Sequence, residues 1–64
     1  MLITKKNLII IKDYKEIKIL NSKLVVINMD DYSCKIKGEN LRMMYYDSYE
    51  MRLTGLIKVI YYGV

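Results

Sequence analysis

The sequence of 64 residues contains no histidine, proline, tryptophan or phenylalanine, and it has a single cysteine, Cys34. Without histidine, the chain cannot build a Ser-His-Asp or Cys-His catalytic site of its own, or a zinc site from its own cysteines and histidines. A lone cysteine excludes an internal disulfide and is typical of a reducing compartment. We therefore expect a protein that is not an enzyme, with no catalytic residues, metal, cofactor or small-molecule substrate.

Long apolar runs are also missing. No stretch approaches the ~20 apolar residues that a transmembrane helix needs. Residues 1–6 begin like a leader peptide, but the apolar run that follows, residues 8–11, is too short for one. These observations predict a soluble, cytoplasmic protein with one small domain spanning residues 1–64.

The charge balance is mildly basic, with 11 Lys and Arg against 7 Asp and Glu and a net charge of +4. This is less than a dedicated nucleic-acid-binding protein usually carries, so nucleic acid is a disfavoured partner. Hydrophobic residues make up 53% of the chain, which is a globular composition. A chain this short buries only about 60% of the surface that its unfolded form exposes. With no disulfide or metal available, we expect a homo-oligomer in which self-association adds stability.

The residues that are present favour strands, because Ile, Val, Thr and seven Tyr dominate the apolar set. Apolar and polar residues alternate with a period of two between short groups of turn residues. The predicted strands are residues 8–11, 16–19, 23–27, 32–37, 41–46, 49–54 and 56–62. Residues 38–40 are predicted to be a connection, and Gly55 a bulge or bend. The expected fold is all-β: a small antiparallel meander of six or seven short strands, curled as a barrel or sandwich.

Alternation also assigns side chains to faces. It places Tyr32, Cys34 and Ile36 on the core face, so Cys34 is predicted to be a small buried hydrophobe. Regular alternation extends this core face to a further set of residues in the later strands: Leu41, Met43, Tyr45, Ile57, Val59 and Tyr61. The opposite face then receives Met44, Tyr46, Leu56, Lys58, Ile60 and Tyr62.

An apolar patch on that opposite face indicates an interface, since exposed Tyr and Met are frequent at contact surfaces. The predicted partner interface consists of Met44, Tyr46, Leu56, Lys58, Ile60 and Tyr62. The alternative is a sheet that curls enough to bury these residues. Residues 56–62 carry one charge, so this strand is predicted to pair with another chain or another copy. On this hypothesis, Ile60→Lys weakens association without unfolding the protein.

A second function is open to the same sheet. The solvent face is predicted to carry basic residues interleaved with Tyr46 and Tyr62, as a platform for single-stranded nucleic acid requires. The basic residues of this face are Lys35, Lys37, Arg42, Arg52 and Lys58, and the first four form the candidate nucleic-acid site. The ordinary interpretation, a solvated charged face, is favoured over this one. A small nucleic-acid-binding β-barrel therefore stands as the alternative function.

The segments Lys-Ile-Lys-Gly-Glu-Asn-Leu-Arg-Met at residues 35–43 and Met-Arg-Leu-Thr-Gly-Leu-Ile-Lys-Val-Ile-Tyr at residues 51–61 resemble the YabP/YqfC family of sporulation proteins. The turn positions between residues 8 and 27 are similar to its YqfC-like branch. This resemblance implies a non-enzymatic role in endospore formation, in the mother cell and at the forespore surface or spore coat. It also implies a membrane-bound sporulation protein as a partner. The predicted function is thus a self-assembling or partner-docking β module.

Overall fold

The protein folds into one six-stranded antiparallel sheet, which the computed structural model describes for residues 1–63. The strands are β1 (Leu2–Lys5), β2 (Leu8–Lys12), β3 (Glu16–Leu20), β4 (Leu24–Asn28), β5 (Ser33–Tyr46) and β6 (Glu50–Gly63). Their order across the sheet is β1-β2-β6-β5-β4-β3. Strands β3 to β6 form a meander, and the β1–β2 hairpin pairs with the near half of β6. The predicted all-β, antiparallel fold is confirmed.

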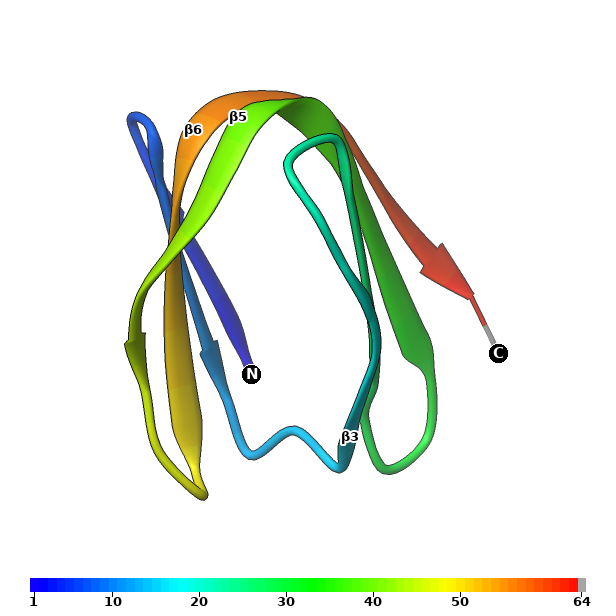
Figure 1. Cartoon of the computed structure of the whole chain (residues 1–64). Coiled ribbons are helices and arrows are strands. Elements are labelled where there is room, and N and C mark those ends of the chain that lie inside the picture. Colours follow the sequence, from blue (N-terminus) through cyan, green and yellow to red (C-terminus); the bar gives the residue numbers. More distant parts are fainter. Residues whose placement is uncertain (64) are drawn as a thin grey trace.

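The two long strands bend together and fold the sheet over itself as an arch (Figure 1). One half of the arch contains β1, β2 and the parts of β5 and β6 next to their shared turn. The other half contains β3, β4 and the remaining parts of β5 and β6. The β2–β3 connection crosses between the two halves at the open end (Figure 1). Within residues 1–63 no ladder joins β1 to β3, so the sheet is not a closed barrel and its halves face each other as in a sandwich.

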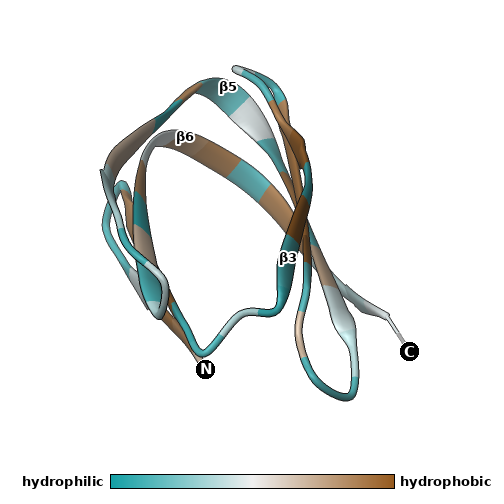
Figure 2. Cartoon of the chain, turned by 60° about the horizontal axis from the view of Figure 1, so that its bottom comes forward, coloured by the Kyte–Doolittle hydropathy of each residue, from teal (hydrophilic) through white to brown (hydrophobic). Residues whose placement is uncertain are grey.

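The hydrophobic core lies between the two halves. Its members are Ile9, Ile11, Val25, Ile27, Met29, Cys34, Ile36, Leu41, Met51 and Leu53. We call the side of the sheet that carries them the inner face and the opposite side the outer face. Polar and apolar residues alternate over residues 50–54 of β6, because successive side chains point to opposite faces. Beyond Gly55 the strand is mainly hydrophobic, and Figure 2 shows this stretch interrupted by a hydrophilic band. The predicted burial of Cys34 and Ile36, with Lys35 and Lys37 exposed between and beyond them, is confirmed.

The bend coincides with breaks in the β5–β6 register. Gly55 has a φ of 133°, and Asn40, on the facing strand, has a φ of 53°. A Cβ atom on Gly38 would lie 2.1 Å from the backbone oxygen of Leu56, so only glycine permits this approach. The prediction that residues 38–40 form a connection is wrong, because the ladder continues on both sides of them. The prediction of a bulge or bend at Gly55 is confirmed.

Two bulges invert the predicted faces. Met44 is an extra residue between Met43, which is opposite Leu53, and Tyr45, which is opposite Arg52. Lys58 is likewise extra on β6. An added residue moves every later side chain to the other face. The predicted assignments are therefore wrong after each bulge: Tyr46, Ile60 and Tyr62 lie on the inner face, and Tyr45, Val59 and Tyr61 lie on the outer face.

The first strand is an addition to the predicted set. Leu2–Lys5 pairs with β2 through a tight turn in which Asn7 has a φ of 58°. Asparagine tolerates this left-handed conformation better than most residues. With this strand added and two pairs of predicted strands merged into β5 and β6, the six observed strands replace the seven predicted segments.

Candidate interaction surface

The C-terminal half of β6 has one unpaired edge. β2 covers β6 only along Glu50–Thr54, whereas β5 follows the other side of β6 as far as Gly63. From Leu56 onward, the remaining edge therefore has no neighbouring strand within the described chain. Its single charged side chain, Lys58, forms an ion pair with Glu39 (3.3 Å). A simple meander predicts that β6 is an outer strand of the sheet. In the structure β6 lies between β2 and β5, but its C-terminal half has a free edge.

The other edges carry features that oppose strand pairing. The β3 edge bears Glu16 and Lys18, which form an ion pair, and its register shifts between Ile17 and Ile19. β1 is only four residues long and ends in Lys5. The free part of β5 is interrupted by the Met44 bulge. The β6 edge also has a bulge, at Lys58, but the residues beyond it, 59–63, carry no charge and keep a regular register with β5. This last stretch is therefore the least protected part of the four edges.

The six residues of the predicted partner interface fall into separate places. Met44 is 67% exposed and lines a small hollow at the bend. The ring of Tyr46 lies 6.3 Å from that of Tyr14, near the β5–β6 turn. The structure does bring together four of the six along the free half of β6: Leu56, Lys58, Ile60 and Tyr62.

These four residues differ in exposure. Leu56 is 52% exposed, whereas Ile60 is partly buried and packs against the core. Tyr62 is 62% exposed and its ring lies 6.2 Å from that of Tyr32. Burial raises the pKa of the Tyr62 hydroxyl. Because Ile60 faces the core, Ile60→Lys would disturb the fold as well as the edge, so it cannot isolate association.

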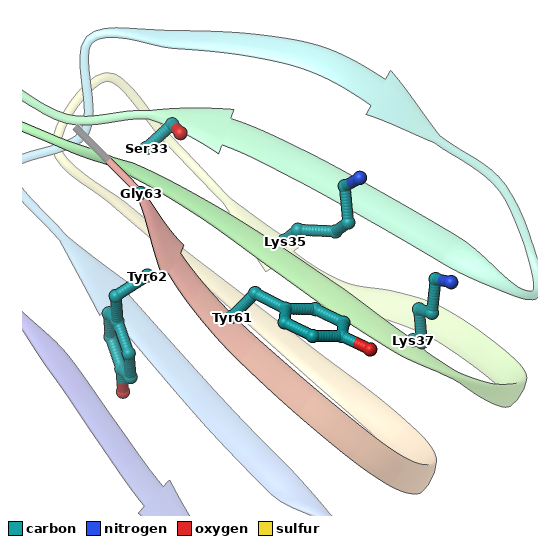
Figure 3. Close-up of a pocket in the computed structure, with 6 residues that line it drawn as sticks. All are labelled: Ser33, Lys35, Lys37, Tyr61, Tyr62 and Gly63. Carbon is teal, nitrogen blue, oxygen red and sulfur yellow. The ribbon is translucent and has the colours of Figure 1, made fainter.

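A shallow hollow of about 450 Å³ lies on the outer face beside this edge. It is lined by Ser33, Lys35, Lys37, Tyr61, Tyr62 and Gly63. Figure 3 shows the ring of Tyr61 extending toward Lys37, while Tyr62 points away. The Lys37 ammonium is 5.8 Å from the centre of the Tyr61 ring. Tyr61 was missed in the sequence because the Lys58 bulge could not be seen. Once the register is known, the pairing of Tyr61 with Lys35 places Tyr61 on the outer face beside the lysines.

The two arginines of the predicted nucleic-acid face lie elsewhere. Arg42 is opposite Thr54 on the outer face of the other half, beyond the bend. The Arg52 guanidinium is 5.0 Å from the centre of the Tyr45 ring and donates from Nε to Glu50 at 2.5 Å. The structure therefore divides the four predicted basic residues into two pairs, and one member of the second pair is neutralised by a carboxylate.

The β5–β6 turn is held by Asp47. Its carboxylate accepts hydrogen bonds from the Tyr45 hydroxyl (2.7 Å) and from the backbone N–H groups of Tyr49 and Glu50 (both 2.8 Å). These bonds lower the pKa of Asp47. The hydroxyl of Tyr14 donates to the Asp47 backbone oxygen at 2.5 Å, and burial raises the pKa of Tyr14 to about 12. Asp47 thus acts as a turn residue.

The Cys34 thiol and the acidic side chains form no reactive or metal-binding site in the described residues. Burial raises the pKa of the Cys34 thiol, which keeps it in the less nucleophilic protonated form. No group of three or more Cys, Asp or Glu side chains within residues 1–63 is placed to hold a metal ion. The same residues include no helix that could cross a membrane.

No family model matches the chain, and no curated protein or solved structure matches it.

Proposed function

We propose that the protein is a non-enzymatic β module that self-associates through the unpaired half of β6, from Leu56 to Gly63. The observation that carries this proposal is the free edge itself, which bears one charged residue and lies next to exposed Leu56, Val59 and Tyr61. An unpaired edge offers a row of backbone N–H and C=O groups to another strand. Pairing would satisfy these groups and cover apolar area that a small domain leaves exposed.

A second copy of the chain is the partner that fits this edge best. Two copies can pair antiparallel about a two-fold axis perpendicular to the sheet, which closes the assembly as a dimer. In that arrangement outer-face residues of one copy lie opposite outer-face residues of the other. Pairing β6 with the β3 edge instead would meet the charges of Glu16 and Lys18 and the bulge beside them.

The double variant Val59→Glu/Tyr61→Glu tests this pairing. Both positions are on the outer face, opposite Lys37 and Lys35, so the new carboxylates have favourable partners within one chain. In each symmetric register centred on residue 59, 60 or 61, a glutamate would lie directly opposite a glutamate of the second copy. We expect a dissociation constant raised roughly tenfold, measured by sedimentation equilibrium, because such like-charge pairs are destabilising.

The matched control compares the single variants Val59→Glu and Ile19→Glu. Both replace a β-branched residue on the outer face, with 40% and 42% exposure, but Ile19 lies on the β3 edge. Only the β6 variant should weaken association, while circular dichroism shows that both remain folded. A wild-type chain that stays monomeric up to near-millimolar concentration, or equal effects of the two variants, would overturn the proposal.

The cellular setting follows from the resemblance of residues 35–43 and 51–61 to the YabP/YqfC family. We propose that the module acts in the mother cell during endospore formation, at the forespore surface or spore coat, where it also docks onto a membrane-bound sporulation protein. A fluorescently tagged copy should then collect around the developing forespore in the source organism. A diffuse signal, or a host that never sporulates, would contradict this setting and leave self-association to be judged by sedimentation.

A further inference from the structure

We propose that the outer-face hollow formed by Lys35, Lys37 and Tyr61 binds single-stranded nucleic acid. The three side chains come from adjacent strands, and Tyr61 is directly opposite Lys35 in the ladder. They line an open hollow of about 450 Å³, where the Tyr61 ring lies beside the lysines and its hydroxyl end points toward Lys37 (Figure 3). Ammonium groups beside an exposed ring are the elements that contact a phosphodiester backbone and its bases.

The charge of this hollow is available to a ligand. No carboxylate within residues 1–63 lies within 4.0 Å of either Lys35 or Lys37, whereas Lys15, Lys18, Arg52 and Lys58 each have an acidic partner. The Lys37 ammonium lies 5.8 Å from the centre of the Tyr61 ring. The net charge of +4 adds a favourable long-range field for a polyanion.

The aromatic ring favours nucleic acid over other polyanions. Tyr61 is 49% exposed on a solvent-facing sheet, so part of its ring is free to stack. Stacking of a base on an aromatic side chain strengthens binding and tolerates any base. An acidic peptide or an anionic membrane would use the two lysines, but neither requires an aromatic ring beside them.

Self-association would double the site, and this step alone rests on the proposed function. Symmetric pairing at β6 keeps both outer faces on one side of the joined sheet. The two Lys35 residues would then be three strand spacings apart, about 14 Å across the sheet. One strand of nucleic acid could follow both hollows, whereas a monomer would offer one.

The test measures fluorescence anisotropy of a labelled oligo-dT with the full chain at low salt. We expect binding that falls steeply as salt rises. The double variant Lys35→Ala/Lys37→Ala should reduce the salt slope by about 1.4, because each phosphate contact to a single strand contributes about 0.7. Tyr61→Leu should weaken oligo-dT binding roughly tenfold while leaving binding of inorganic polyphosphate unchanged, because polyphosphate has no bases to stack.

Arg42→Ala is the matched control, because it removes one cation from the outer face of the other half. It should leave oligo-dT binding within about twofold, the change expected from net charge alone. The proposal is overturned if wild type fails to bind at low salt, or if Tyr61→Leu binds oligo-dT as wild type does. Tighter binding to polyglutamate or to phosphatidylserine vesicles would assign the hollow to a peptide or a membrane instead. Sedimentation of the same samples reports self-association independently, so a failure to bind oligo-dT can be distinguished from a failure to dimerise.

Discussion

Gly38→Ala is expected to remove about 3 kcal/mol or more from the free energy of unfolding, a large share of the total for this domain. A domain of this length has only about 3 to 10 kcal/mol of stability. The added methyl group would lie 2.1 Å from the backbone oxygen of Leu56 and 3.1 Å from Leu41 Cδ2. Backbone atoms on the paired strand can yield only if the bend itself changes. Chemical denaturation followed by circular dichroism measures the loss.

Gly63→Ala is the matched control for this substitution. The nearest atom to its added methyl group is the Ser33 hydroxyl oxygen at 3.2 Å, which a side-chain rotation can move. It should cost less than about 0.5 kcal/mol, as most surface substitutions do. Equal stability of the two variants would mean that the close approach of β5 and β6 at the bend is not required for folding.

Ile36→Ala is expected to destabilise the protein by about 2–5 kcal/mol, the range for truncating a buried isoleucine. Ile36 is fully buried and lies between Val25 on β4 and Ile60 on β6 in the ladder. The two halves of the arch share one core, so a cavity at this position weakens the packing of both. Thermal or chemical unfolding gives the difference directly.

Val59→Ala provides the comparison for this core variant, because Val59 is next to Ile60 in sequence but 40% exposed on the outer face. We expect a change below about 1 kcal/mol, since an exposed side chain loses few contacts. If both variants lose the same stability, then the inner and outer faces assigned here to the C-terminal half of β6 are incorrect.

The turns were predictable because their residues act locally. At the predicted turn 21–22, the Asn21 side chain accepts hydrogen bonds from the backbone N–H groups of Lys23 (2.9 Å) and Leu24 (2.8 Å). Asp47 does the same at the β5–β6 turn. Each such turn depends on a few neighbouring residues, so its chemistry can be read in the sequence.

The bulges were not predictable, because a bulge is defined by the facing strand. Nothing in the residues around Met44 or Lys58 distinguishes an extra residue from regular alternation. The consequence was an inverted assignment for Tyr46, Ile60 and Tyr62. The sequence therefore predicted two parts of the candidate surface: the exposed Lys35 and Lys37, and the strand at residues 56–62 with its single charge. It could not reveal that Tyr61 joins the lysines or that the bend separates Arg42 and Arg52 from them.

The pairing of β2 with β6 determines when the fold can be completed during synthesis. Residues Leu8–Lys12 leave the ribosome well before their ladder partners, Glu50–Thr54. Until those residues appear, the β1–β2 hairpin has no sheet to join, and two-stranded hairpins are marginally stable in water. Ile9 and Ile11, which are buried in the folded core, remain exposed until their partners Leu53 and Met51 have been synthesised. Folding therefore waits for a non-local strand pairing, which limits its rate.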